Sequence, residues 1–325
     1  MLKRALIGGL LTAALVLTTT PAMQTTHVQA AKAYKIVFVA GIASDAFYIT
    51  MNHGIQAEAK AEGLPAPQFT GSTAAWGPSY QTPFLNATIA KHPDLIIIAP
   101  TDVIAMRAPI VAAVKAGIPV LFVDTTLNDS SMAVTTISTD NLAGGVAAAD
   151  ALAKAIGAKG GEVAGINTVP GVSTTDARMK GFTQELKKYP QLDNLGTTYA
   201  TDDSTKAATI LKALVAAHPH LAGVFAMNVV TGDGVTAAAK EEGVKGLKLV
   251  EFDAGPAQVA ALKKGQITAL IAQYPYGIGT MAVKLGVEYL NNHNVKLARH
   301  YGTPTGIITQ ANVNSPSMAN FLYTQ

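Results

Sequence analysis

The sequence predicts an α/β protein with two similar halves, each built on a parallel sheet. Short apolar runs alternate with helical patterns along nearly the whole chain, and this alternation calls for parallel strands joined by right-handed crossovers. The chain also resembles itself. Residues 91–100 are similar to residues 218–227, and each segment is followed by a helix, a glycine turn and an apolar run that ends in aspartate. An offset of 126 to 129 residues indicates two domains of one fold, with strand ends facing each other across a cleft.

The predicted strands and helices follow one another in regular order. Strands are expected at residues 35–40, 95–99, 119–123, 134–137, 162–167, 196–200, 221–226, 248–252 and 268–272. Helices are expected at residues 46–62, 79–91, 109–116, 141–156, 176–188, 204–217, 231–242, 256–264 and 277–291. Gly63, Gly117, Gly157, Gly243 and Gly265 follow five of these helices, where glycine commonly takes the left-handed conformation that ends a helix.

The first thirty residues have the order of a cleavable signal peptide. Lys3 and Arg4 precede an apolar run, and Val28-Gln29-Ala30 has the small-x-small form of a cleavage site. We therefore expect residues 1–30 to be a signal peptide that is removed on export. Cleavage after Ala30 removes two basic residues and no acids, which changes the net charge from +3 to +1.

Charge and cysteine content narrow the class of protein further. A nearly neutral mature chain without a basic stripe predicts no nucleic-acid partner. The chain has no cysteine, so we expect neither disulfides nor a thioether lipid anchor. These observations predict a soluble protein in an exported compartment, most simply the periplasm.

No pattern in the chain indicates catalysis, a cofactor or a metal site. The first strand is not followed by G-x-G-x-x-G, and the chain contains no P-loop, no G-x-S-x-G and no H-E-x-x-H. His218 and His220 form the closest histidine pair, and an exposed turn suits them better than a metal site. We therefore expect a binding protein without a cofactor, and not an enzyme.

The segment Ser44-Asp-Ala-Phe-Tyr48 is the first candidate site, because it follows the first strand at the edge where open α/β sheets bind ligands. The Asp45 carboxylate can accept hydrogen bonds from hydroxyls, and the rings of Phe47 and Tyr48 can cover C–H surface. This combination suits a polyhydroxylated ligand. The alternative is an Asp45 N-cap followed by two aromatic residues of the core.

Polar residues also end four apolar strands, and these are Asp124, Asn228, Asp253 and Gln273. Side chains at such positions point into the expected cleft, although each one alone could be a cap or a turn former. Trp76, the only tryptophan, lies in a glycine-rich loop at the cleft edge. Its ring is either a stacking platform or lid for a ligand, or the packing centre of its own loop.

The segments that carry a family resemblance are residues 44–48, 94–102, 117–124, 138–141, 144–145, 178–182, 224–228, 252–253 and 271–275. With these, the mature chain resembles the periplasmic sugar-binding proteins of ABC importers, in particular the ribose-binding-protein type. The resemblance implies an α/β fold of type I, with two Rossmann-like parallel-sheet lobes joined by a three-strand hinge. It implies an N-terminal lobe of residues 31–138 and 275–303, and a C-terminal lobe of residues 139–274 and 304–325.

The resemblance also implies roles for the candidate residues. It assigns Phe47 and Tyr48 to an aromatic pair that sandwiches the sugar, and it assigns Asp124, Asn228, Asp253 and Gln273 to polar contacts with it.

Four ligand positions depart from the ribose pattern. Asp45 replaces an amide, Thr125 and Asp176 replace two arginines, and Asp202 replaces an aromatic residue. Arg178, a neighbour in the same helix, is favoured as a structural residue. The implied pocket is more acidic than a ribose pocket, which leaves other neutral monosaccharides, polyols and cyclic diols as candidate ligands.

The implied partners are a small-molecule sugar or polyol and the membrane subunits of an ABC permease, with the receptor itself a monomer. Two alternatives stay open. The loaded protein could signal to a chemoreceptor or a sensor kinase, or the chain could be an exported sugar-modifying enzyme in which Asp45 and Asp176 act as acid and base. A transcription regulator is disfavoured, because a signal peptide stands where a DNA-binding domain would precede the first lobe.

Overall fold

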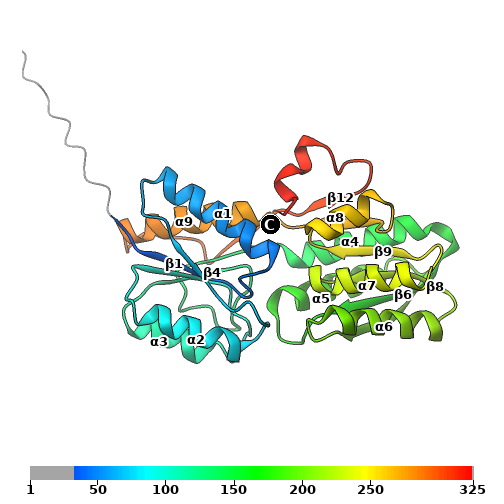
Figure 1. The fold of residues 1–325 in the computed structure, drawn as a ribbon, viewed down its shortest axis with the longest axis horizontal. Helices are drawn as coiled ribbons and strands as arrows, with labels where there is room; N and C mark the ends of the chain where they lie inside the picture. Colours follow the sequence, from blue (N-terminus) through cyan, green and yellow to red (C-terminus); the bar gives the residue numbers. More distant parts are fainter. Residues whose placement is uncertain (1–32, 324–325) are drawn as a thin grey trace, which may run out of the picture. The chain divides into compact units, whose positions relative to one another are not determined.

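The computed structural model describes residues 33–323, so the expected signal peptide lies outside the described residues. Two six-stranded sheets form the framework (Figure 1). In the first sheet the order is β11-β5-β4-β3-β1-β2, and in the second it is β12-β10-β9-β8-β6-β7. All pairings are parallel except that of β10 with β12, which is antiparallel. The predicted pair of parallel-sheet lobes is therefore confirmed.

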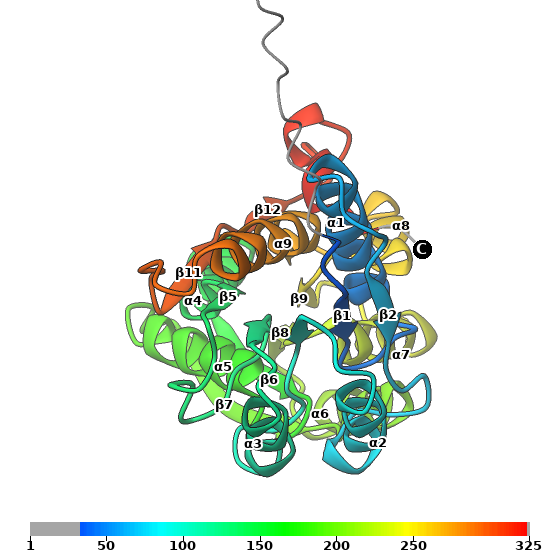
Figure 2. The same cartoon turned by 90° about the vertical axis from the view of Figure 1, so that its left-hand side faces the viewer.

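The strands of the first sheet are β1 (Ile36–Val39), β2 (Gln68–Thr70), β3 (Leu95–Ile98), β4 (Val120–Val123), β5 (Thr136–Thr139) and β11 (His300–Thr303). Central strands such as β3 and β4 are wholly apolar and buried, as expected for parallel strands covered on both faces. Helices α1 (Ala46–Ala61) and α9 (Pro275–Asn291) pack on one face, and α2 (Pro78–Ile89) and α3 (Arg107–Lys115) pack on the other (Figure 2).

The strands of the second sheet are β6 (Gly161–Asn167), β7 (Leu192–Tyr199), β8 (Leu221–Ala226), β9 (Lys248–Phe252), β10 (Ala269–Ala272) and β12 (Gly306–Ile308). Helices α4 (Asn141–Ile156) and α5 (Ser173–Leu186) cover one face, and α6 (Ser204–Ala217) and α7 (Val229–Glu241) cover the other. Helix α8 (Pro256–Lys263) lies beside α7, and two short 3₁₀ helices, η1 (Gly157–Lys159) and η2 (Pro316–Phe321), complete the fold.

The chain passes between the two sheets three times. It leaves β5 for α4, leaves β10 for α9, and leaves β11 for β12. These crossings form the three-strand hinge that the family resemblance implies. The predicted strands lack β2, which has only three residues. They also lack β11 and β12, because β11 reads His-Tyr-Gly-Thr and β12 has only three residues. Neither has the apolar alternation that marks a strand.

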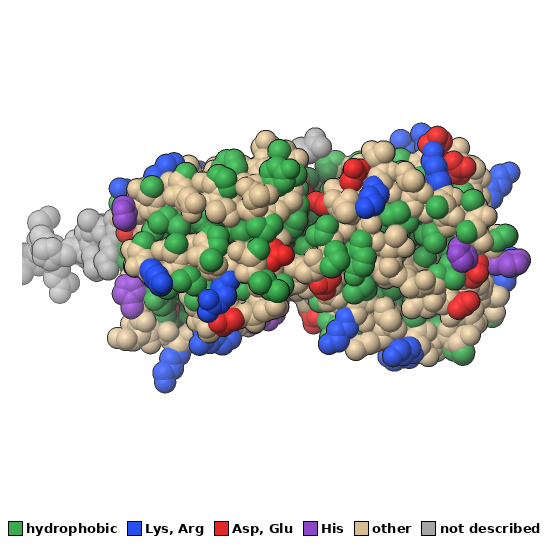
Figure 3. Space-filling view, turned by 90° about the horizontal axis from the view of Figure 1, so that it is seen from below, with side chains coloured by type: hydrophobic (Ala, Val, Ile, Leu, Met, Phe, Trp, Pro, Cys, Tyr) green, Lys and Arg blue, Asp and Glu red, His purple; other side chains and the backbone are tan. Residues whose placement is uncertain are grey.

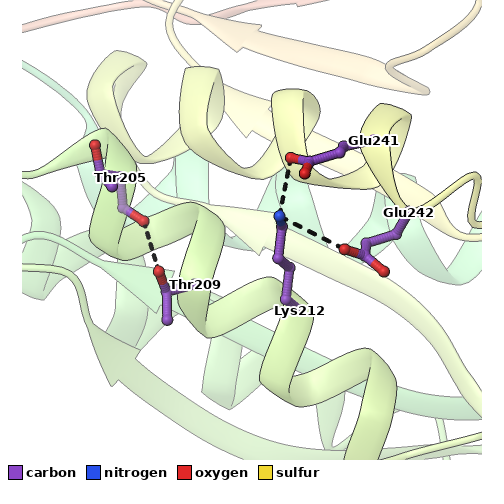
Figure 4. A network of polar contacts seen from close by, with 5 residues as sticks. All are labelled: Thr205, Thr209, Lys212, Glu241 and Glu242. Atoms are coloured by element: carbon purple, nitrogen blue, oxygen red, sulfur yellow. Dashed lines mark hydrogen bonds and ion pairs between the residues drawn. The ribbon is translucent and has the colours of Figure 1, made fainter.

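Most helix ends agree with the prediction. Gly63, Gly117, Gly157, Gly243 and Gly265 all have positive φ angles, which favours glycine at these turns. Ion pairs between neighbouring helices lie at the surface. Lys212 of α6 contacts Glu241 at 2.9 Å and Glu242 at 3.5 Å near the end of α7 (Figure 4). Exposed pairs of this kind stabilise a fold only slightly.

The surface offers no broad patch of one sign on the face that Figure 3 shows, where Lys and Arg are interspersed with Asp and Glu. Acidic side chains also lie at the boundary between the two halves of this face. Within residues 33–323, no helix is both long and apolar enough to cross a membrane.

Candidate functional site

A cavity between the carboxyl ends of the strands of both sheets is the candidate site. Its empty volume, with the open solvent at its mouth included, is about 500 Å³. The lining residues are Ile42, Asp45, Phe47, Tyr48, Trp76, Asp124, Thr168, Val172, Thr174, Thr175, Arg178, Asp202, Asn228, Val229, Asp253 and Gln273. Nine of the eleven residues proposed from the sequence are among them, all except Thr125 and Asp176.

Thr125 and Asp176 lie outside the lining for different reasons. Thr125 is only 1% exposed, and its hydroxyl has no hydrogen-bond partner among the described residues. It is buried next to Asp124 and does not reach the cavity. Asp176, in the first turn of α5, accepts a hydrogen bond from the backbone N–H of Gly171 at 3.0 Å. Its carboxylate is therefore used to hold the loop that precedes α5.

Asp45 is both a helix cap and a lining residue, so the two alternatives for it do not exclude each other. Its Oδ1 accepts from the backbone N–H of Phe47 at 2.8 Å at the start of α1. The pKa of Asp45 is raised to about 7. Burial is the largest cause, the Phe47 N–H opposes it, and repulsion from Asp253, Asp202 and Asp124 adds to it. At neutral pH this carboxyl group can therefore hold a proton.

The two adjacent aromatic residues line the cavity together. The rings of Phe47 and Tyr48 meet edge to face with centroids 5.1 Å apart, so these two rings leave no room for a ligand between them. The Tyr48 hydroxyl donates to Asp124 Oδ2 at 2.7 Å. Asp124 has φ = +61°, a conformation that few residues other than glycine, asparagine and aspartate adopt.

The pKa of Asp124 is raised to about 6. Burial is the largest cause, and it outweighs the Tyr48 hydrogen bond and the positive charge of Arg178, both of which lower the pKa.

Asp253 is held more firmly than any other carboxylate of the lining. Its Oδ2 accepts from the backbone N–H of Val229 at 3.0 Å. Its Oδ1 accepts from Gln273 Nε2 at 2.7 Å and from the Tyr323 hydroxyl at 2.9 Å. Gln273 is itself fixed, because Thr139 donates to its Oε1 at 2.7 Å. The carboxylate of Asp253 therefore has one orientation before any ligand arrives.

Asn228 and Asp202 form a second fixed pair. Asn228 caps α7 through its Oδ1, which accepts from the N–H of Thr231 at 2.9 Å. Its Nδ2 donates to Asp202 Oδ1 at 2.9 Å. Burial raises the pKa of Asp202, and the charge of Asp253 adds to this effect, whereas the Asn228 hydrogen bond lowers it.

Arg178 is the one cationic residue of the lining, and the sequence interpretation favoured a structural role for it. Arg178 lines the cavity and also has a structural role. It is 2% exposed, its Nε donates to Asn141 Oδ1 at 2.8 Å, and its Nη1 donates to the carbonyl of Met227 at 2.7 Å. Its guanidinium carbon lies 3.6 Å from the centroid of the Phe252 ring. These contacts, all with residues of the second lobe, hold the positively charged guanidinium at the wall of the cavity.

Sequence reasoning missed the loop after β6 and the start of α5. Thr168, Val172, Thr174 and Thr175 come from this stretch, and all four line the cavity. The strand-end rule that selected Asp124 and Asp253 also applies to the end of β6 at Asn167, so the signal was present in the chain. Tyr323, whose hydroxyl donates to Asp253, does not follow an apolar strand, so the strand-end rule could not identify it. Among residues 33–323, no group of three or more His, Cys, Asp or Glu side chains is arranged to hold a metal ion.

Comparison with known proteins agrees with this architecture. The chain is 29% identical over 264 residues to the ribose import binding protein RbsB of Bacillus subtilis, spanning 81% of this chain and 83% of that protein. It is 28% identical over 273 residues to the D-allose-binding periplasmic protein of Escherichia coli, spanning 82% of this chain and 87% of that protein.

A solved ABC transporter solute-binding protein from Agrobacterium vitis, bound with α-D-tagatopyranose, is 38% identical. It superimposes with a TM-score of 0.85, covering 90% of this chain and all of that chain. Residues 36–294 match the profile of the family described as periplasmic binding protein domain. The chain therefore belongs to the periplasmic binding protein family and has its type I fold.

Proposed function

We propose that this protein captures a neutral monosaccharide or polyol in the cavity between its lobes and delivers it to an ABC permease. One observation carries the proposal: carboxylates, amides and aromatic rings from the strand ends of both sheets converge on a single cavity. The relatives support the ligand class, because their descriptions name ribose, D-allose and α-D-tagatopyranose. Residues 31–138 with 275–303 form the first lobe in this proposal, and residues 139–274 with 304–325 form the second.

The lining suits hydroxyl groups. Asp253, Asp202 and Asn228 are held by protein hydrogen bonds, so their remaining acceptor and donor positions face the ligand without a cost in side-chain entropy. Hydrogen bonds to charged groups contribute about 1.5–3 kcal/mol each. Two or three of them, with ring contacts from Phe47 and Tyr48, are enough for a micromolar Kd, which corresponds to about −8 kcal/mol.

The acidic lining separates this site from that of a ribose binder. Asp45, Asp124, Asp202 and Asp253 face one another, and Arg178 is the one cation among the lining residues. Asp45 and Asp124 have raised pKa values of about 7 and about 6, so one or both can hold a proton and donate to a ligand oxygen. A mixture of donors and acceptors of this kind recognises a neutral polyol, and it repels an anionic sugar.

Binding is coupled to lobe closure in this proposal. The lobes touch across the cleft, where the backbone N–H of Thr126 donates to Ser173 Oγ at 3.0 Å and that of Val103 donates to the Gly171 carbonyl at 3.4 Å. A ligand that contacts both lobes binds the closed state better than an open one and shifts the population toward it. The permease then recognises the closed pair of lobes.

The experiment that tests the proposal is a calorimetric and thermal-shift panel of pentoses, hexoses and polyols with the mature protein. A ligand at 100 times its Kd stabilises the fold by about 2.7 kcal/mol, visible as a raised Tm. We expect one or a few stereoisomers to bind and to be recovered chemically unaltered, which separates a receptor from a sugar-modifying enzyme. No binding across the panel, or a chemically changed sugar, would contradict the proposal.

Export to the periplasm, signal-peptide cleavage and a monomeric state belong to the same proposal. Mass spectrometry of the secreted protein tests cleavage after Ala30, and light scattering tests the monomer. Binding to a chemoreceptor domain, assayed with and without sugar, distinguishes a signalling role from one in transport alone.

A further inference from the structure

We propose that Tyr323, which follows η2, is a positioning residue of the binding site. Its hydroxyl fixes the carboxylate of Asp253 and its ring holds Phe47, so that it prolongs the life of the closed, ligand-bound state. This inference rests on the proposed binding of a sugar or polyol.

The hydroxyl of Tyr323 joins two groups of the site. It donates to Asp253 Oδ1 at 2.9 Å and accepts from the backbone N–H of Gln273 at 3.2 Å. Tyr323 is 5% exposed, and burial, with the nearby charge of Asp253, raises its pKa well above the usual 10. The hydroxyl therefore keeps its proton at physiological pH and always offers it to the carboxylate.

The ring of Tyr323 reaches the other lobe. It meets the ring of Phe47 at 64° with centroids 5.7 Å apart. Phe47 lies in α1 on the first sheet, whereas Asp253 follows β9 of the second. One buried side chain thus contacts a lining residue from each lobe. Tyr323 does not itself line the cavity, so it acts on a ligand only through Asp253 and Phe47.

The segment that carries Tyr323 is packed on the hinge. The ring of Phe321 lies 5.9 Å from that of Tyr274, which follows β10 where the chain returns to the first lobe. The same ring fills the space beside Gly306, where an added Cβ would lie 2.8 Å from Phe321 Cγ. The backbone N–H of Tyr323 donates to the Ala254 carbonyl at 3.1 Å. Two of the three chain crossings therefore support the position of Tyr323.

The rates of sugar association and dissociation test this role. Tryptophan fluorescence can report them, because Trp76 is the only tryptophan of the chain and lines the cavity. Stopped-flow tryptophan fluorescence with the best sugar of the panel follows both rates. Tyr323→Phe removes the hydroxyl and keeps the ring, and Tyr323→Leu removes both. The matched control is Tyr189→Phe, because the Tyr189 hydroxyl donates to Asp150 at 2.7 Å on an exposed part of the second lobe.

We expect Tyr323→Phe to weaken binding by about tenfold, almost entirely through faster dissociation. We expect Tyr323→Leu to weaken it by about 100-fold, because the contact with Phe47 is lost as well. Tyr189→Phe should bind like the parent protein. Parent-like affinity and dissociation in Tyr323→Phe would overturn the inference, and so would a loss carried by slower association alone.

A second measurement needs no variant. The backbone N–H of Gln273 donates to the Tyr323 hydroxyl, so its hydrogen exchange should slow at least tenfold when sugar saturates the protein. Unchanged exchange would overturn the proposed role even if a variant failed to fold. If the parent protein bound no sugar at all, the proposed function itself would be wrong. If the parent bound sugar and only the Tyr323 measurements disagreed, the proposed role of Tyr323 alone would be wrong.

Discussion

Replacement of Asp253 by Asn tests the site most directly. The backbone at this position has φ = +80°, which costs an ordinary L-residue about 1–2 kcal/mol. Ala would therefore add backbone strain to the loss of the carboxylate, whereas Asn tolerates the left-handed region nearly as well as Asp does. Asp253→Asn replaces one carboxylate oxygen by an NH₂ group and removes the negative charge, and it leaves the size and the backbone preference of the residue in place.

The expected loss follows from the contacts of the carboxylate. Its Oδ1 accepts from Gln273 and Tyr323, and its Oδ2 accepts from the Val229 N–H. An amide nitrogen at either position faces a donor and cannot accept from it. The ligand also loses a hydrogen bond to a charged acceptor. Together these effects amount to about 3 kcal/mol, or about 150-fold in Kd.

Isothermal titration calorimetry with the best sugar of the panel measures this change. Asp193→Asn is the control, because Asp193 is an exposed residue of β7 outside the cavity. We expect a parent-like Kd for the control and a Kd about 150 times higher for Asp253→Asn. A Kd within threefold of the parent value for Asp253→Asn would refute the assignment of this carboxylate to the ligand.

The remaining predictions concern Arg178, the buried acids and Trp76. Arg178→Met should lower the free energy of unfolding by about 2–4 kcal/mol in urea titrations, because Asn141 and a backbone carbonyl lose their buried donor; an unchanged midpoint would contradict this. The raised pKa of Asp45, about 7, means that the folded state binds more protons than the unfolded chain between about pH 4 and 7. The contribution of Asp45 to the stability of the unliganded protein should therefore fall as pH rises from about 4 to 7 and level off above 7, and Asp45→Asn should flatten the dependence of Tm on pH over this range. Gly41→Ala places a Cβ in steric overlap with the Trp76 ring, so tryptophan emission should shift and sugar affinity should fall about tenfold as the ring is displaced.

The fold was predictable because parallel strands covered on both faces leave a strong signal. Runs such as Leu95–Ile98 and Val120–Val123 are continuously apolar, and glycines that follow the helices indicated where the helices end. The short edge strand β2 carries no such signal, and neither do the edge strands β11 and β12. Their pairing with β5 and β10 is set by the return of the chain across the hinge, which is a tertiary effect.

The candidate site was predictable only in part. Asp124 and Asp253 could be found because they end apolar strands, and their positive φ angles place them at the sharp turns that follow. Asp176 and Thr125 were proposed from the positions of arginines in a related pocket. In the structure Thr125 is buried beside Asp124, and Asp176 accepts a hydrogen bond from the backbone of Gly171, so neither lines the cavity. Tyr323 lies 70 residues from its partner Asp253, and no local pattern connects the two.

The acidic lining still needs a source of stabilisation for the carboxyl groups that are ionised, because Arg178 is the one cation beside the four aspartates of the cavity. Helix N-termini supply it. Asp45 accepts the Phe47 N–H at the start of α1, and Asp253 accepts the Val229 N–H at the start of α7. The unpaired N–H groups and the dipole of a helix favour negative charge at this end. A fold whose strand ends lead directly into helix N-termini can therefore hold several acidic side chains in its cleft beside a single arginine. In the proposed function, hydroxyls of a neutral ligand complete the hydrogen bonding of these side chains.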